Sequence, residues 1–130
     1  MPHIRISDAA RFLGVSDDTV RRWIGAGALA STTDSTGRMA IEGRELAQFA
    51  KAQAGGPELP GAHSSARNRM VGLVTAVTAD MVMAQVEMQC GPFRVVSLMS
   101  SEAVRELGLE VGSVAVAVIK STNVIIESPA

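Results

Sequence analysis

Apolar and polar positions alternate with helical spacing in the N-terminal part of the chain and with strand spacing in the C-terminal part. In the first part, a short helix follows Ser7 and ends at Gly14, because serine caps helix starts and glycine favours the backbone that ends them. A second helix follows the cap Ser16, and three of its apolar residues have helical spacing: Val20, Trp23 and Ile24. Two short helices joined by a turn that contains glycine are typical of a helix-turn-helix.

A hairpin and a third helix complete this part. Residues 30–41 predict the hairpin, and residues 42–53 predict the helix. The predicted order is therefore helix, turn, helix, wing, helix. Arg21 and Arg22 fall outside the apolar stripe of the second helix and face outward, and Arg38 follows the tip of the wing.

A segment rich in glycine and proline follows at residues 54–64. These residues exclude a regular helix or strand, so we expect a tether. The predicted organisation is an α+β chain of two domains. A winged helix-turn-helix occupies residues 1–53, and a β-barrel with one helix occupies residues 65–130.

The C-terminal part predicts five strands and one helix. Alternation over residues 70–78 places Val71 and Val77 on one face of the first strand and Val74 on the other. The remaining elements follow as strand, strand, helix, strand and strand, at residues 81–90, 93–99, 101–107, 113–120 and 124–127. This order predicts a small OB-like barrel.

The fourth strand has no polar face, because residues 114–119 are all apolar. One side of such a strand can fill a small barrel, and the other side then needs cover from a second chain. We therefore expect a homo-oligomer. The sequence leaves a dimer and a hexamer open.

Composition restricts the class of protein. The 130 residues include 12 basic and 13 acidic side chains, a formal net charge of −1, so any nucleic-acid surface must be local. Residues 1–54 carry seven basic and six acidic side chains, a net of +1. A single cysteine excludes an intrachain disulfide, and no apolar run approaches the ~20 residues that span a bilayer. We expect a cytoplasmic protein with no membrane segment.

Catalytic patterns are missing from the sequence. It contains no paired carboxylates, no Ser/His/Asp set and no glycine-rich phosphate loop. Cys90 has no His or Cys partner at metal-ligand spacing, so we interpret it as a buried apolar residue. We expect neither an enzyme nor a metal ion held directly by protein ligands.

Two short polar runs flank the predicted barrel. Ser65-Ala66-Arg67-Asn68 stands where the linker ends, and Lys120-Ser121-Thr122-Asn123 follows the apolar fourth strand. Hydroxyls, backbone N–H groups, one guanidinium and one ammonium are the donors that suit a tetrahedral dianion. Each run alone is an ordinary loop or strand end. Together they predict one oxyanion site.

The N-terminal part resembles the winged helix-turn-helix of MerR-type and excisionase-like DNA-binding domains. The matching motifs are Ile6-Ser7-Asp8-Ala9-Ala10, Gly14-Val15-Ser16, Thr19-Val20-Arg21-Arg22-Trp23 and Gly27-Ala28-Leu29. The resemblance implies that Ser16, Thr19, Arg21 and Arg22 lie in the major groove of double-stranded DNA, with Arg38 of the wing at the backbone or minor groove. A helical module that binds a protein is the alternative.

The C-terminal part resembles the Mop-type molybdate-binding domain of molbindins and of molybdate-responsive repressors. Both polar runs, the strand pattern and the helix of residues 101–109 carry the likeness. The resemblance implies that molybdate or tungstate lies between subunits. Its ligands would be Ser65, Ala66 and Arg67 from one chain and Lys120 and Ser121 from its neighbour.

Together these interpretations predict a molybdate- or tungstate-sensing DNA-binding transcriptional regulator. The alternative is an intracellular molybdate store or buffer whose helical head has no regulatory role. The sequence leaves open the preferred oxyanion, the operator, and whether the protein activates or represses.

Overall fold

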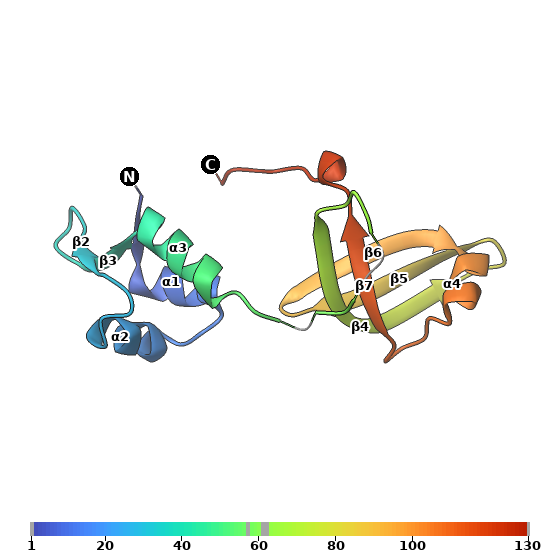
Figure 1. Ribbon diagram of the computed structural model, residues 1–130, viewed down its shortest axis with the longest axis horizontal. Coiled ribbons are helices and arrows are strands. Elements are labelled where there is room, and N and C mark those ends of the chain that lie inside the picture. The colour runs from blue at the N-terminus through green and yellow to red at the C-terminus, as the bar shows by residue number, and fades with distance from the viewer. Residues whose placement is uncertain (1, 57, 61–62, 130) are drawn as a thin grey trace. The chain divides into compact units, whose positions relative to one another are not determined.

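The computed structural model describes residues 2–56, 58–60 and 63–129. The chain consists of two compact units, which we call the head unit (Met1–Gly55) and the sheet unit (Gly56–Ala130). The division falls inside the segment in which the sequence predicts a linker. The mixed α+β class is confirmed (Figure 1). No helix in the described ranges combines the length and the apolar character needed to cross a lipid bilayer.

The head unit combines three helices with a small antiparallel sheet. Its elements are β1 (His3–Arg5), α1 (Ile6–Leu13), α2 (Asp17–Gly25), β2 (Thr32–Thr33), β3 (Met39–Glu42) and α3 (Gly43–Gln53). The sheet order is β1-β3-β2. The order helix, turn, helix, wing, helix agrees with the prediction, whereas the hydrophobic pattern does not predict β1.

The two helices of the helix-turn-helix start in different ways. Ser16 is the N-cap of α2, and its hydroxyl accepts a hydrogen bond from the Thr19 N–H at 3.2 Å, which confirms the predicted cap. The predicted Ser7 cap is wrong, because α1 already begins at Ile6, and its N-cap Arg5 makes no side-chain cap hydrogen bond. The preceding strand β1 is paired with β3, and this pairing sets the point where the chain turns into α1.

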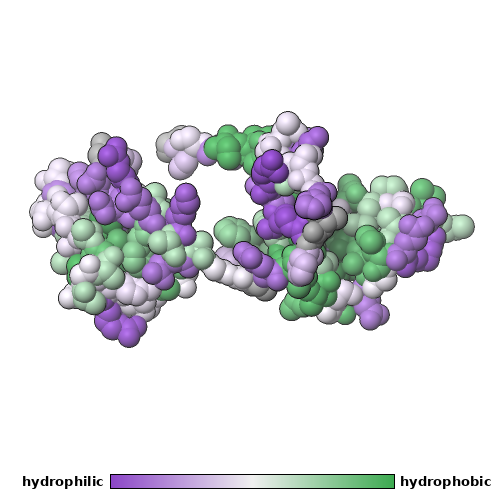
Figure 2. All heavy atoms as spheres, in the orientation of Figure 1, coloured by the Kyte–Doolittle hydropathy of each residue, from purple (hydrophilic) through white to green (hydrophobic). Residues whose placement is uncertain are grey.

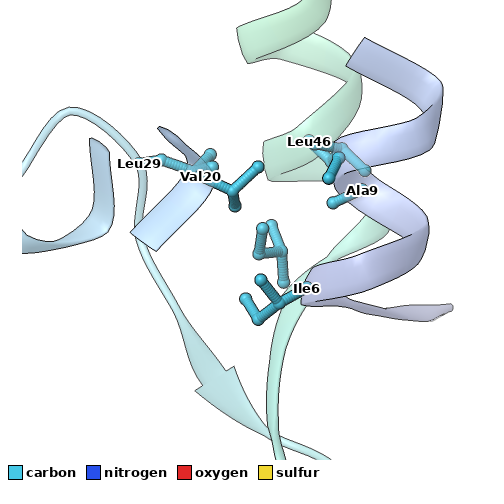
Figure 3. Close-up of a cluster of buried hydrophobic side chains, with 7 residues drawn as sticks. Ile6, Ala9, Val20, Leu29 and Leu46 are labelled. Carbon is cyan, nitrogen blue, oxygen red and sulfur yellow. The ribbon is translucent and has the colours of Figure 1, made fainter. Parts of the chain in front are cut away.

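One buried cluster joins the helices of the head unit to its sheet (Figure 3). Its members are Ile6, Ala9, Ala10, Val20, Leu29, Ile41 and Leu46. Trp23 and Phe49 pack beside this cluster, with their ring centroids 5.0 Å apart. The cluster fixes α2 against α1, so the outward face of α2 has a defined direction.

The sheet unit is a curled antiparallel half-barrel of four strands (Figure 1). Its elements are β4 (Asn68–Ala79), β5 (Met83–Cys90), β6 (Phe93–Ser100), α4 (Ser101–Leu107), β7 (Val114–Ile119) and the short 3-10 turn η1 (Ser121–Asn123). The strand order is β6-β5-β4-β7. The helix α4 starts and stops as predicted, with Gly108 in the left-handed conformation just after it. Cys90 is buried, as expected.

The predicted fifth strand at residues 124–127 is wrong for a single chain. After η1 this segment leaves the sheet, and its Ile125 and Ile126 are 85% and 86% exposed. Within the described residues, no backbone hydrogen bond joins the segment to the edge of β6 or β7. The chain therefore forms an open half-barrel instead of the predicted five-stranded barrel.

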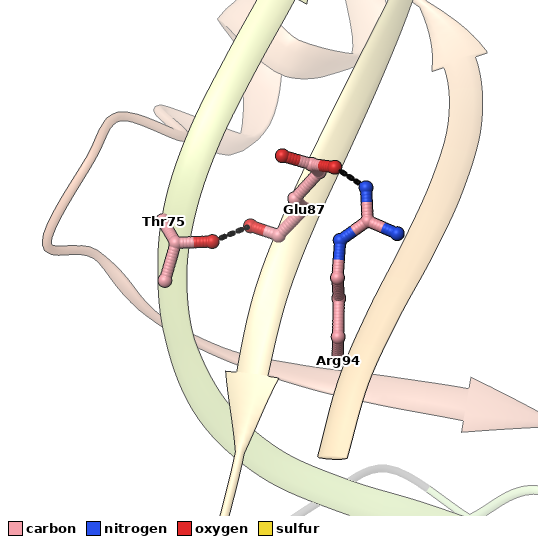
Figure 4. A network of polar contacts seen from close by, with 3 residues as sticks. All are labelled: Thr75, Glu87 and Arg94. Carbon is pink, nitrogen blue, oxygen red and sulfur yellow. Dashed lines mark hydrogen bonds and ion pairs between the residues drawn. The ribbon is translucent and has the colours of Figure 1, made fainter. Parts of the chain in front are cut away.

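A β-bulge in β4 changes which residues face the core. The register with β5 shifts after Val74. Val74 and Val77 therefore both pack into the core, and the alternation predicted for this strand fails at Thr75. Thr75 donates its hydroxyl to the carbonyl oxygen of Glu87 at 3.3 Å, and the Glu87 carboxylate pairs with Arg94 (Figure 4).

The last strand, β7, is apolar on both faces. Ala115 and Ala117 pack toward the core, whereas Val114 and Val118 are 59% and 46% exposed. Val114 is also the β-partner of Leu73, which is 51% exposed. A single chain thus leaves an apolar outer surface over β4 and β7 in contact with water, which agrees with the expected need for cover.

Gly72 provides a test of this packing. A Cβ at this position would meet the carbonyl oxygen of Gln89 and would lie 2.7 Å from the Cys90 sulfur. We expect Gly72→Ala to destabilise the sheet unit by ~1–3 kcal/mol, because the added methyl group would force β4 away from the neighbouring strand β5 and disturb the packing between them. Thermal denaturation measures the loss. Gly56→Ala is the control, since a Cβ there meets no atom within 4 Å; equal midpoints for the two variants would contradict the packing.

Candidate functional site

The two polar runs meet at one end of the β4–β7 pair. Asn68 opens β4, Ile119 closes β7, and these residues are antiparallel partners. The Asn68 side chain also donates from Nδ2 to the Ile119 carbonyl oxygen at 3.1 Å, across 51 positions of sequence. Arg67 precedes the first of these residues and Lys120 follows the second. A single chain therefore brings the two predicted cationic residues to the same end of the β4–β7 pair.

Ser64 organises the first run, a role that the sequence pattern does not single out. Its hydroxyl accepts a hydrogen bond from the Ala66 N–H at 3.0 Å, and its carbonyl oxygen accepts one from Arg67 Nη1 at 3.5 Å. An incoming anion would compete with Ser64 for both donors. The spacing of Ser64 and Ala66 is the sequence feature that indicates this role, since a serine hydroxyl commonly accepts a hydrogen bond from the backbone N–H two residues further on.

The second run is a single helical turn. Lys120 is the N-cap of η1, and its carbonyl oxygen accepts a hydrogen bond from the Asn123 N–H at 2.9 Å. The side chains of Lys120 and Ser121 are exposed, as are those of Ser65 and Arg67. Neither cation forms an ion pair with any residue that the structure describes.

This donor set is chemically suited to an oxyanion. A guanidinium supplies directed donors, an ammonium supplies a compact charge, and the hydroxyls can turn toward an oxygen. The described ranges contain no group of three His, Cys, Asp or Glu residues that could hold a metal ion. Exposed charges attract an ion only weakly in water, so the site of a single chain would gain strength if a neighbour excluded the solvent.

In the head unit, three of the predicted DNA-binding residues form a network at the start of α2. The hydroxyl oxygens of Ser16 and Thr19 are 3.0 Å apart, and Arg22 donates from Nη2 to the Thr19 hydroxyl at 3.2 Å. The network holds the Arg22 guanidinium along the exposed surface of the helix. Polar donors and one positive charge thus share the first turns of α2.

A second basic group contains an arginine that the sequence analysis does not single out. Arg5 lines a hollow of about 390 Å³ together with Arg21 and Arg38, the other two predicted DNA-binding residues. Asp17 lines the same hollow and opposes part of this charge. Arg5 reaches the group because it ends β1, and β1 is recognised only through its pairing with β3.

The wing places Arg38 through an ordered turn at Asp34. The Asp34 carboxylate accepts hydrogen bonds from the Thr36 N–H at 2.8 Å, the Thr36 hydroxyl at 2.6 Å and the Arg38 N–H at 3.0 Å. The hydrogen bond from the Thr36 hydroxyl, followed by that from the Arg38 backbone, lowers the pKa of the Asp34 carboxyl below its ordinary value, and the nearby charge of Arg5 lowers it further. The ionised carboxylate therefore stabilises the turn that precedes Arg38.

Two family models match the chain. Residues 64–126 match the TOBE domain, and residues 4–54 match a helix-turn-helix domain. Molybdenum-pterin-binding protein 3 of Clostridium pasteurianum is 41% identical over 63 residues, which cover 48% of this chain and 93% of the relative. The chain belongs to the TOBE domain family through its sheet unit and carries an N-terminal helix-turn-helix domain.

Two solved structures are similar to the sheet unit. The cytoplasmic molybdate-binding protein ModG, solved with molybdate bound, has a TM-score of 0.51 at 40% identity, over 53% of this chain and 50% of ModG. A molybdate-binding protein from Sporomusa ovata has a TM-score of 0.50 at 24% identity, over 52% of this chain and all of that chain, and supports the fold alone. The relatives are named as binding proteins, which agrees with the expectation that this chain is not an enzyme.

The turn at Asp34 gives a prediction for the wing. Asp34→Ala removes three hydrogen bonds, so we expect faster amide hydrogen exchange at Thr36 and Arg38 in an otherwise folded head unit. Because the folded pKa is depressed, the contribution of the carboxylate is complete above the ordinary aspartate pKa and is lost as the pH falls through the lowered folded value. Exchange measured by NMR against pH tests both effects. Unchanged rates in the variant would contradict this role for Asp34.

Proposed function

We propose that the protein is a molybdate- or tungstate-responsive transcriptional regulator, in which the sheet unit binds the oxyanion and the head unit binds double-stranded DNA. Arg67 and Lys120 stand at the same end of the β4–β7 pair, so each chain can present both halves of such a site to neighbouring chains, and this placement carries the proposal. The names of the relatives support the choice of ligand, because they bind molybdate or molybdenum-pterin. The description of ModG supports a cytoplasmic location.

The proposed oxyanion site lies between subunits of a homo-oligomer, a dimer or a hexamer. Ser65, Ala66 and Arg67 of one chain would face Lys120 and Ser121 of its neighbour. The exposure of Ser65, Arg67, Lys120 and Ser121 in a single chain supports this arrangement, since a second chain would exclude water and strengthen each charge-assisted hydrogen bond. Binding would also release Ala66 and Arg67 from their bonds to Ser64.

An anion held by two chains gives a direct route to regulation. Such a ligand favours the arrangement of subunits in which both sets of donors are close together. That arrangement then determines how the tethered head units are presented to DNA. Residues 1–54 carry a net charge of only +1, so useful affinity for DNA requires several heads in one assembly.

An oxyanion store or buffer is the second candidate function. The observation that favours it is Asp17, which lines the same hollow as the three arginines and repels phosphate. In this case the head unit would have no regulatory role, and the sheet unit alone would carry the activity.

The oxyanion site predicts strong effects of two substitutions. We expect Arg67→Ala and Lys120→Ala each to abolish molybdate binding measured by calorimetry, because each removes a charged donor from a site for a dianion. Arg69→Ala is the matched control, since Arg69 is exposed on β4 and lies one residue beyond Asn68. Affinity retained in both site variants would remove the central claim.

Mixed oligomers test whether the site is shared between chains. Chains with Arg67→Ala and chains with Lys120→Ala are co-expressed and purified as a mixed oligomer. If each site uses Arg67 of one chain and Lys120 of its neighbour, an alternating pair contains one site with both cations intact, and part of the molybdate binding returns. If both cations come from the same chain, every site is defective and no binding returns.

The regulatory role predicts DNA binding that responds to molybdate. We expect the protein to bind the DNA upstream of its own gene with an affinity that changes when molybdate is added. Arg5→Ala should weaken this binding. It should also reduce the slope of the logarithm of the binding constant against the logarithm of the salt concentration by about 1, as expected for the loss of one phosphate contact. Arg11→Ala is the control, because Arg11 already pairs with Asp8 at 3.5 Å on α1. Failure to bind DNA with and without molybdate would favour the store.

A further inference from the structure

The head unit has a second hollow, which is almost wholly apolar and which we call the head groove. It has a volume of about 580 Å³ and is lined mainly by Ile4 of β1, Phe12 and Leu13 of α1, and Leu46, Ala47 and Ala50 of α3. Ala47 and Ala50 have short side chains, so the space between the two helices stays open. Figure 2 shows apolar residues at the surface of the head unit, bordered by polar ones. An apolar surface with a polar border is typical of a contact with another protein.

Phe12 stands at the rim of the head groove and projects into solvent. It is 71% exposed, whereas the other two aromatic residues of the head unit, Trp23 and Phe49, pack beside the buried cluster. The same surface therefore carries an exposed aromatic side chain and a hollow that can accept one. A contact between two identical surfaces requires this kind of self-complementarity. A second copy of the head unit is thus the partner that fits the head groove.

The charges beside Phe12 and beside the head groove are complementary. Asp8 lies one turn before Phe12, so both side chains share one face of α1. Arg44 lines the head groove three residues before Ala47, and within the described ranges no acidic side chain pairs with Arg44. With α1 of one copy beside α3 of the other, and both running in the same direction, Phe12 enters the groove while Asp8 meets Arg44. The existing pair of Asp8 with Arg11 is exposed to water, so it would oppose this exchange only weakly.

We propose that the head units of two chains pair through their head grooves, with Phe12 of each chain in the groove of the other and Asp8 of each chain facing Arg44 of the other. Two-fold symmetry makes each of these contacts twice. The contact is small, so it depends on linkers that hold the heads of one assembly together at an effective concentration on the order of millimolar. The inference therefore rests on the homo-oligomer of the proposed function.

This pairing would leave the basic group of the head unit available to DNA. Among the described residues, none lines both the head groove and the hollow of Arg5, Arg21 and Arg38. Two α2 helices related by a two-fold axis would contact half-sites that are arranged as an inverted repeat. The pairing thus deepens the proposed function, because it specifies the symmetry of the operator.

Cross-linking tests the pairing on the full chain without molybdate or DNA. One chain carries Arg11→Cys, beside Phe12, and a second chain with a different tag carries Gln48→Cys, beside Ala47; both positions are exposed. After co-expression and treatment with a short bismaleimide, we expect a covalent dimer that carries both tags. The wild type should give no such product, because its Cys90 is buried.

The matched control replaces Gln48→Cys with Ser35→Cys, at an exposed position in the wing. Random encounters of tethered heads would link both pairs of chains equally, so the pairing predicts a several-fold higher yield for the Gln48→Cys pair. Equal yields would overturn it. Light scattering on the same samples separates this outcome from a failure of the proposed assembly: oligomers with equal yields contradict the pairing alone, whereas monomers without a cross-link contradict both.

Charge reversal provides a second test, with the Arg11→Cys and Gln48→Cys cross-link as its readout. Asp8→Arg in both chains places two cations together and should reduce the yield to that of the Ser35→Cys control. Adding Arg44→Asp to both chains restores opposite charges, so we expect the yield to return. A purely structural defect from Asp8→Arg would not be repaired in this way. A yield that Asp8→Arg leaves unchanged, or that does not return with Arg44→Asp, would overturn the pairing.

Discussion

The antiparallel pairing of β4 with β7 is the contact on which the proposed oxyanion site depends. Arg67 and Lys120 are distant in sequence and reach the same end of the sheet only because Asn68 stands opposite Ile119, so one region of each chain can offer both halves of a site to its neighbours. Shifting the register by one residue would turn every side chain of β7 to the other face and would place valines where Ala115 and Ala117 now pack. The requirement for a well-packed core therefore also fixes the position of the polar runs.

Local pattern predicts the elements of this chain well and the contacts between them poorly. The Ser16 cap and the two polar runs can be recognised from residue type and spacing, because each involves only a few neighbouring positions. The pairing of β1 does not follow from local pattern, because three residues carry too little periodicity, and for the same reason the pattern does not single out Arg5. The bulge at Thr75 and the path of residues 124–127 depend on neighbouring strands, so no local alternation rule predicts them.

In a single chain, the proposed oxyanion site and the proposed DNA-binding surface would each attract their negatively charged ligand only weakly. The oxyanion site has two cations but is exposed to water, where each interaction is screened. The surface of the head unit gathers three arginines, yet the net charge of residues 1–54 is only +1 and Asp17 lies among the arginines. Assembly of several chains would offset both weaknesses, by excluding water at the first site and by multiplying the contacts at the second. Oligomerisation is therefore the condition that connects sensing to DNA binding in the proposed regulator.

The most direct measurement of the central claim is a calorimetric titration of the intact wild-type chain with molybdate, tungstate and sulfate. We expect saturable binding of molybdate and tungstate, which have the same shape and charge, and much weaker binding of sulfate, which is smaller. The molar ratio at saturation gives the number of sites per chain. An absence of molybdate binding, or equal affinity for sulfate, would contradict the assignment of Ser65, Ala66, Arg67, Lys120 and Ser121 to a molybdate site.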